Sequence, residues 1–302
     1  MLHRSILLPV LLSAILCASC GGGGSEEASI PTTNPGDGVH FNPSYGTNAA
    51  FVPIGNDSSE AEFCADQGKS RWNDYLLENN TWNKGTVTGY TSCMTMKAGV
   101  APGVSPSWRW SWPLSGGDAV RDYPEVIFGQ KPWYASSTTG ALPRVVNTLA
   151  SVTARFGAQL EHSSDGGGNF AFDIWLTTSK SIAPGGSYLP LHTELMILLD
   201  NWGSYQPAGS KIAEVTIDGV VWELYHATAG WGPSPWSYVN YLPKTRLTSP
   251  YQVNIHHFLA DLSARGLITG KEWLASVELG TEILAGSGSA SLQNYSVQVE
   301  LN

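Results

Sequence analysis

Short runs of strand-forming residues, separated by turn residues, extend from about residue 61 to the end of the chain. The clearest runs are VTGYTSCMTM (87–96), FAFDIWLTT (170–178), TELMILL (193–199), IAEVTIDGVVWELYHA (212–227), SYVNYL (237–242) and SLQNYSVQVEL (291–301). Such runs, rich in aromatic and β-branched residues, are typical of β-strands. The Asp218-Gly219 pair predicts a tight hairpin within the fourth run. The 33 glycines and 18 prolines in 302 residues favour many turns over long helices.

One segment, residues 248–266, has the pattern of a helix instead. Thr248 or Ser249 is a candidate cap, Pro250 suits the first turn, and Gly266 is a candidate stop. Apolar residues recur between them with helical spacing, at Ile255, Phe258, Leu259 and Leu262. A single amphipathic helix beside many strands predicts an all-β sandwich with the helix packed on an outer surface.

The N-terminal twenty residues have the pattern of an export signal. Arg4 precedes an apolar run over 6–16, which is too short for a comfortable membrane span, and small residues lead to Cys20. This pattern resembles a bacterial lipoprotein signal in which Cys20 is acylated, although Cys17 stands where leucine is usual. A plain secretory signal is the alternative. Gly21 is not the aspartate that often retains lipoproteins at an inner membrane, which favours an outer-membrane or cell-surface location.

Three segments follow from composition. Residues 1–20 are the signal peptide, and residues 21–60, rich in Gly, Ser, Asn and Pro, are a flexible linker. Residues 61–302 form the functional domain. Export makes Cys64 and Cys93 an expected disulfide, since an even pair in an oxidising compartment usually pairs. Without neighbouring paired histidines these cysteines predict no zinc site, and no metal or other cofactor is expected.

The net charge of −9 argues against a nucleic-acid partner, because phosphates require lysine and arginine to neutralise them. We expect a monomer that meets the membrane only through its N-terminal lipid anchor.

Carboxylates occur on three of the predicted strands. Because residues two apart share a face of a strand, Glu194 shares a face with Met196, and Glu278 shares one with Glu282. Asp173 occupies the strand of the FAFDIWLTT run. An ionised carboxylate is rarely placed among apolar strand residues unless it serves a purpose, because removing it from water is costly.

Paired carboxylates on neighbouring strands suit the hydrolysis of glycosidic bonds. One carboxylate attacks the sugar or activates water while the other, protonated, gives its proton to the leaving oxygen. The chain's 12 tryptophans offer flat apolar platforms for sugar rings. By spacing alone, acidic residues on strands are more often ordinary solvent-facing residues, so this pattern leaves both interpretations open.

From about residue 62 onward the sequence resembles glycoside hydrolase family 12, the endo-β-1,4-glucanases and xyloglucanases with a β-jelly-roll fold. The motifs that carry the resemblance, in the family's order, are NNTW (79–82), YPEVIFG (123–129), LPRVV (142–146), FDIWL (172–176), ELMILL (194–199) and GTEILAGSGSASLQNYSVQV (280–299). The resemblance implies two antiparallel sheets with a concave substrate cleft. It implies no cofactor, and a β-glucan polysaccharide as the partner.

The resemblance also implies roles for particular residues. Glu194 would be the nucleophile, Glu282 the general acid/base, and Asp173 the residue that supports Glu194. Residues expected to bind the glucan are Asn80, Trp82, Trp133, Met196, Trp231, Trp236 and Tyr241. Glu278 is not a catalytic position in the family, and we expect it to act as a neighbour of Glu282 that perturbs its pKa.

Two features depart from the family's pattern. Leu198 replaces the usual tryptophan after Glu-x-Met-Ile, and WGPSPW (231–236) forms an altered loop beside the cleft. Both bear on the choice among cellulose, mixed-linkage β-glucan and xyloglucan. Within enzymes, a related jelly-roll xylanase fits less well. The alternative of another class is a non-catalytic glucan-binding surface lipoprotein, which has no need of Glu194, Glu282 and Asp173 together.

Overall fold

The computed structural model describes residues 62–97, 102–115, 119–132, 134, 136–180, 190–231 and 234–302. The proposed signal peptide, the linker, Cys20 and Trp133 lie outside these residues. In the described part of the chain, no helix is both long enough and apolar enough to cross a bilayer.

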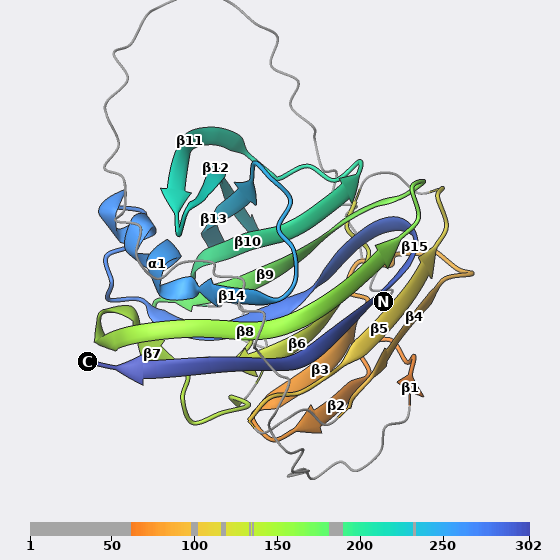
Figure 1. Cartoon of the computed structure of the whole chain (residues 1–302), viewed down its shortest axis with the longest axis horizontal. Helices are drawn as coiled ribbons and strands as arrows, with labels where there is room; N and C mark the ends of the chain where they lie inside the picture. Colours follow the sequence, from red (N-terminus) through yellow and green to blue (C-terminus); the bar gives the residue numbers. More distant parts are fainter. Residues whose placement is uncertain are drawn as a thin grey trace, which may run out of the picture. The chain divides into compact units, whose positions relative to one another are not determined.

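The described residues form a jelly-roll sandwich of two β-sheets, which confirms the predicted all-β class (Figure 1). The first sheet has the order β1-β4-β5-β15-β8-β14 and the second the order β2-β3-β6-β15-β9-β10-β13-β12-β11. The bounds in the first sheet are β1 Glu62–Phe63, β4 Thr91–Thr95, β5 Ser107–Trp112, β8 Leu149–His162 and β14 Tyr251–Asn254. In the second sheet they are β2 Lys69–Trp72, β3 Tyr75–Asn80, β6 Tyr123–Gly129, β9 Gly167–Thr177, β10 Leu191–Gly203, β11 Ser210–Ile217, β12 Val220–Trp231 and β13 Ser234–Pro243.

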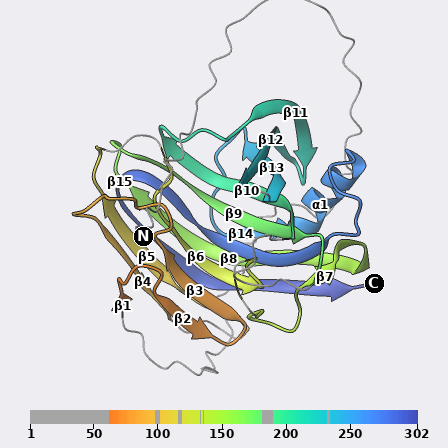
Figure 2. The same ribbon diagram turned by 180° about the vertical axis from the view of Figure 1, so that it is seen from behind.

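The long strand β15, Trp273–Leu301, belongs to both sheets (Figure 2). Its first part pairs with β6 and β9, and with the short strand β7, Arg144–Val145; its last part pairs with β5 and β8. This strand therefore ties the sheet that carries the acidic residues to the sheet behind it.

Alternation along the strands sorts side chains between the core and the opposite face of the second sheet. In β10, Leu195, Ile197 and Leu199 are fully buried in the main hydrophobic core. The same alternation directs Glu194 and Met196 to the other face, as predicted for a strand with period two. The Asp218-Gly219 hairpin is confirmed, since both residues adopt the positive φ that such a turn requires.

Two expectations about the fold were wrong in detail. The helix α1 spans Ile255–Ala264 and does not begin near Pro250, because residues 251–254 pair with β8 as strand β14. The second sheet is not wholly antiparallel: β10 and β13 run parallel, with Glu194 opposite Tyr238. Strands β11 and β12 are antiparallel, and so are β12 and β13, so β13 runs in the same direction as β11.

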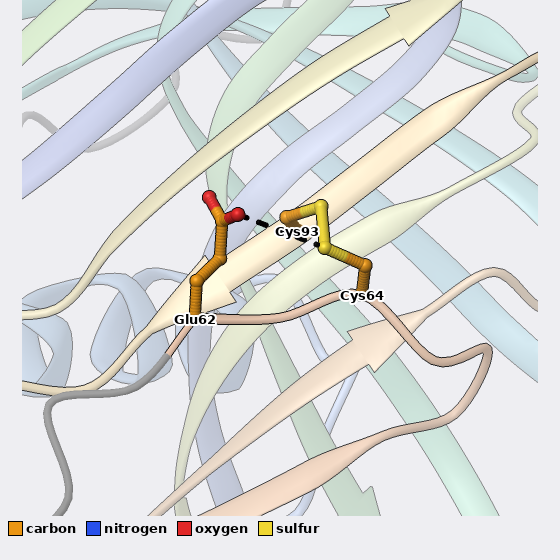
Figure 3. Close-up of side chains that lie close together, drawn as sticks. All are labelled: Glu62, Cys64 and Cys93. Carbon is orange, nitrogen blue, oxygen red and sulfur yellow. Dashed lines mark hydrogen bonds between the residues drawn. A yellow bond between two sulfur atoms is a disulfide. The ribbon is translucent and has the colours of Figure 1, made fainter.

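The predicted disulfide between Cys64 and Cys93 is present and joins the segment after β1 to β4 (Figure 3). The carboxylate of Glu62 lies beside it, with Oε2 3.8 Å from the Cys64 Sγ. Glu62 is also paired with Arg109 at 2.7 Å. Because both sulfurs are consumed by the disulfide, this group of side chains does not offer the thiolates that a metal ion would need.

Candidate active site

The three proposed catalytic carboxyl groups lie on adjacent strands, because β9 is paired with β10 on one side and β15 on the other. Asp173 of β9 is opposite Met196 of β10 and Glu278 of β15. Glu194 is opposite Trp175, and Glu282 is opposite Asn169. All three side chains are partly exposed on the face that points away from the core.

Glu194 is held by an indole from β13. The Nε1–H of Trp236 donates to Oε2 of Glu194 at 2.5 Å, and Trp236 packs edge-on against Trp175. Burial raises the pKa of Glu194 to about 8; the Trp236 hydrogen bond opposes the rise, and the charges of Glu282 and Glu278 add to it. Glu194 is therefore a carboxyl group whose ionisation depends on its neighbours.

Glu282 is held by polar side chains on the same face. Asn169 donates to its Oε2 at 2.5 Å, and Tyr205 also hydrogen-bonds to it. Burial raises the pKa of Glu282 to about 7 against these two hydrogen bonds, which favour the charged form. A carboxylic acid that keeps its proton near neutral pH suits the protonation of a leaving oxygen.

Gly280 lies between Glu278 and Glu282 and allows β15 to approach β6 closely. A Cβ at this position would lie 2.4 Å from the carbonyl oxygen of Pro124 and 2.9 Å from the ring of Tyr123. A side chain here would push β15 away from β6, so glycine is required for the observed register.

Asp173 is the third carboxyl group of the site and lies on β9, between the strands of Glu194 and Glu282. Burial raises its pKa well above the usual value, and the charges of Glu194, Glu278 and Glu282 raise it further, while Lys131 opposes them. Its Oδ1 is buried without a hydrogen-bond partner among the described residues. A protonated Asp173 adds no negative charge beside Glu194, so Glu194 ionises more easily than it would beside a second carboxylate.

A group of buried side chains on β10 and β13 lies on the same face as the two glutamates. Met196 is 2% exposed, and its sulfur accepts a hydrogen bond from the hydroxyl of Tyr238 at 3.3 Å. Asn240 donates to the same hydroxyl at 3.0 Å. Burial raises the pKa of Tyr238, and the charges of Glu282 and of Glu194 raise it further, so Tyr238 lies within electrostatic range of both carboxyl groups.

The residues expected to bind glucan differ in how exposed their side chains are. Trp82 is 51% exposed and free to stack on a sugar, whereas Asn80 is mostly buried and donates to Glu125 at 2.9 Å. Trp236 is largely buried, so it contacts Glu194 instead of presenting an open platform. Trp231 ends β12, and its side chain lies outside the described part of the structure.

The expectation that Tyr241 lines the cleft was wrong. Tyr241 is fully buried on the core side of β13, where its hydroxyl donates to Asp261 of α1 at 2.8 Å and its ring packs against Phe258. The physical reason is strand alternation: Tyr238 and Asn240 share the face of Glu194, and Tyr241 points the other way.

Three residues of the site were missed from the sequence: Asn169, Tyr205 and Tyr238. Asn169 lies four residues before Asp173 on β9, so strand periodicity could have placed it on the same face. Tyr238 could have been found in the same way from Trp236. Tyr205 follows the end of β10 and carries no periodic signal.

Replacing Trp236 with phenylalanine is expected to move the pH of maximal kcat/KM upward and to lower the maximum. The variant loses the N–H that stabilises ionised Glu194, an effect of about one pH unit for a hydrogen bond to a charged group. The pH dependence of kcat/KM on a soluble glucan measures the shift. Trp112→Phe is the matched control, because the Trp112 indole donates to a different carboxylate, Asp122, at 3.1 Å. An equal shift in both variants would assign the effect to general loosening.

The fold and this row of carboxyl groups define a β-sandwich hydrolase with paired acidic residues. Glycosyl hydrolase family 12 matches the chain over residues 73–300, and the chain belongs to that family. Endoglucanase S of Pectobacterium parmentieri is 29% identical over 234 residues, covering 76% of this chain and 83% of that protein. Xyloglucan-specific endo-beta-1,4-glucanase A of Emericella nidulans is 26% identical over 256 residues, covering 83% and 96%.

Solved structures show the same fold. The endoglucanase cel12A from Rhodothermus marinus superposes with a TM-score of 0.67 at 27% identity, covering 80% of this chain and 100% of that one. The family 12 xyloglucanase from Bacillus licheniformis has a TM-score of 0.69 at 24% identity, with the same coverage.

Proposed function

We propose that this protein is a retaining, endo-acting β-1,4-glucanase in which Glu194 is the nucleophile and Glu282 the general acid/base. The observation that supports this most is the placement of Glu194, Asp173 and Glu282 on adjacent strands of one sheet face, within electrostatic range of one another. The family supplies the reaction class, and its motifs supply the two roles. A retaining mechanism requires the two carboxyl groups to stand about 5 to 5.5 Å apart across the bound sugar.

The reaction proceeds in two steps. An oxygen of Glu194 forms a bond to the anomeric carbon while the glycosidic C–O bond breaks, and Glu282 gives its proton to the departing sugar oxygen. Water then attacks the same carbon and gives a proton to Glu282, and the bond to Glu194 breaks. Two inversions give net retention, and both carboxyl groups return to their starting states.

Glu194, with a pKa of about 8, and Glu282, with a pKa of about 7, both keep protons near neutral pH, and the pair loses its first proton in this range. The pKa values of both groups are raised by burial, and the charge of Glu282 raises that of Glu194 further. The two carboxyl groups therefore titrate as a coupled pair, in which the loss of one proton affects the loss of the other. The active form has lost one proton and carries the other on Glu282.

The alternative class, a glucan-binding protein without activity, needs aromatic platforms but no acid pair with raised pKa values. Removing carboxyl groups even partly from water is costly, and a protein that only binds gains nothing from three of them on one face. The site therefore favours catalysis.

The substrate is a glucan with a β-1,4-linked backbone: cellulose, mixed-linkage β-glucan or xyloglucan. The chain's relatives include proteins named as an endoglucanase and as a xyloglucan-specific endoglucanase. Leu198 is fully buried beside Met196, where the family's tryptophan would place a larger ring. We propose that this smaller side chain changes the floor of the cleft and so affects which glucan is preferred.

The test is reducing-sugar release from carboxymethylcellulose, barley β-glucan, xyloglucan and xylan, combined with NMR of the first product formed. Release from a β-1,4-glucan, with the β-anomer appearing first, supports a retaining glucanase. Binding without release favours the capture protein, release from xylan alone the related xylanase, and an α-anomer formed first an inverting mechanism.

Trp82→Ala is expected to raise KM for polymeric glucan about tenfold and to change kcat little, because an exposed ring that stacks on a sugar contributes binding more than chemistry. Leu301→Ala removes a similarly exposed apolar side chain, at the far end of β15, and is the control. Kinetics on a soluble glucan measure both. An unchanged KM in Trp82→Ala would remove this residue from the binding site.

We further propose that the chain is exported and anchored through acylated Cys20, with residues 21–60 as the tether and 61–302 as a monomeric catalytic domain. The export pattern of residues 1–20 and the polar composition of the linker support this. Metabolic labelling with a fatty acid, compared between the parent and Cys20→Ala, tests the anchor.

A further inference from the structure

A second group of charged side chains lies on the same sheet face, beside the catalytic pair. Lys131, which follows β6, places its Nζ 3.3 Å from Oε2 of Glu78 and 3.5 Å from Oε2 of Glu278, and it contacts Glu125 directly. These four residues, here called the Lys131 cluster, come from β3, β6, β15 and the segment after β6. All four are buried, with Lys131 the most exposed at 7%.

The cluster holds three carboxyl groups around one ammonium group. Glu78 and Glu125 are directly opposite each other in the β3–β6 pair, where like charges repel. Burial raises the pKa of Glu125 well above its usual value, in opposition to Lys131 and with help from the charge of Glu278. Ser276 donates to Oε1 of Glu278 at 2.6 Å, whereas Oε2 has no hydrogen-bond partner among the described residues and is only ion-paired with Lys131.

Glu278 connects this cluster to the catalytic residues. It is directly opposite Asp173 in the β15–β9 pair, and Asp173 is in turn opposite Met196, two residues from Glu194. The charge of Glu278 contributes to the raised pKa of both Asp173 and Glu194. The charge of Glu78, two strands further away, is not among the causes of the shift at Glu194.

Several other titratable groups act on this part of the face. They are Glu282 on β15, Tyr123 and Glu125 on β6, Glu78 on β3, Tyr238 on β13, Tyr205 after β10, and Lys131 and Tyr134 after β6. Lys131 is the cation that acts on Asp173, and it reaches Asp173 from the far side of Glu278.

We propose that Glu278, held in place by Lys131 and Ser276, is a positioning residue that sets the charge balance between Asp173 and Glu194 and thereby the pH at which the catalytic pair works. This inference rests on the proposed function. Glu278 is fully buried, so we expect it to act through Asp173 and Glu194 and not by contact with the substrate.

Glu278→Gln removes the charge and keeps the shape of the side chain. The pH of maximal kcat/KM is expected to fall by about 0.5 to 1 unit, the size of one charge interaction across a protein interior. Glu78→Gln is the matched control: it is the same substitution, at a buried glutamate that also contacts Lys131, and its pH optimum is expected to stay at the parent's value. In both variants Lys131 keeps two carboxyl partners, so no buried cation is left uncompensated.

Glu278→Asp keeps the charge and is expected to restore the parent's pH optimum, which a purely structural role of Glu278 does not predict. If Glu278→Gln does not fold, Ser276→Ala replaces it. That variant removes a donor to the Glu278 carboxylate and is expected to lower the pH optimum by a smaller amount.

The proposal is overturned if the pH of maximal kcat/KM is unchanged in Glu278→Gln, or if it falls equally in Glu78→Gln. Either result leaves the proposed function intact. A parent that hydrolyses no β-1,4-glucan overturns the proposed function instead. In that case carboxyl ¹³C NMR titration of parent and variant reads the ionisation of Glu194 directly. A titration midpoint that is lower in Glu278→Gln supports the positioning role, and an unchanged midpoint refutes it.

Discussion

Glu194→Gln is expected to reduce kcat/KM on soluble glucan by on the order of 10³-fold or more, because the amide cannot form the bond to the anomeric carbon. The substitution preserves size, and the side-chain oxygen of glutamine still accepts the Trp236 N–H. The protein should therefore fold as the parent does. Initial rates and thermal unfolding of the purified domain measure the two properties separately.

Glu223→Gln is the control for that loss. Glu223 lies on β12 of the same sheet, but it is bound to Lys211 at 2.8 Å, away from the carboxyl row. Its activity should match that of the parent. A Glu194→Gln protein that keeps more than about a tenth of the parent's activity would argue that another group attacks the sugar, since loss of a nucleophile costs far more.

The strand content of the molecule could be predicted from the sequence because alternation is a local signal. The β10 run placed Glu194 and Met196 on one face and Leu195 and Ile197 on the other, and the structure confirms that division. The start of α1 could not be predicted in the same way. The cap and proline signals near residue 250 are local, whereas the pairing of residues 251–254 with β8 is a contact between distant segments.

The composition of the site was predictable only in part, for a related reason. Family motifs lead to Glu194, Glu282 and Asp173, but no sequence pattern states that Lys131 meets Glu78 and Glu278. Those contacts arise from the order β3-β6-β15 in the sheet, which joins residues far apart in the chain. Tyr241 shows the opposite error: its motif position suggested the cleft, and the alternation of β13 places it in the core.

Glu282→Gln is expected to lower glucan hydrolysis by about 10²- to 10⁴-fold, the usual contribution of a general acid. The loss should depend on the substrate. An aryl cellobioside with an acidic phenol as leaving group needs no proton, so its first step should proceed at nearly the parent's rate. The second step, which needs Glu282 as a base, should then limit turnover, and a burst of released phenol should be seen.

Added azide separates the roles of Glu194 and Glu282, which the electrostatics alone do not. In Glu282→Gln, azide needs no base, so it should attack the glycosyl-enzyme, accelerate turnover and give a β-glycosyl azide. In a Glu194→Gly protein, azide should replace the missing carboxylate and attack the β-glycoside directly, giving the α-glycosyl azide. NMR of the two products distinguishes them. Because each anomer reports which side of the sugar was opened, an α-azide from the Glu282 variant would reverse the two assignments.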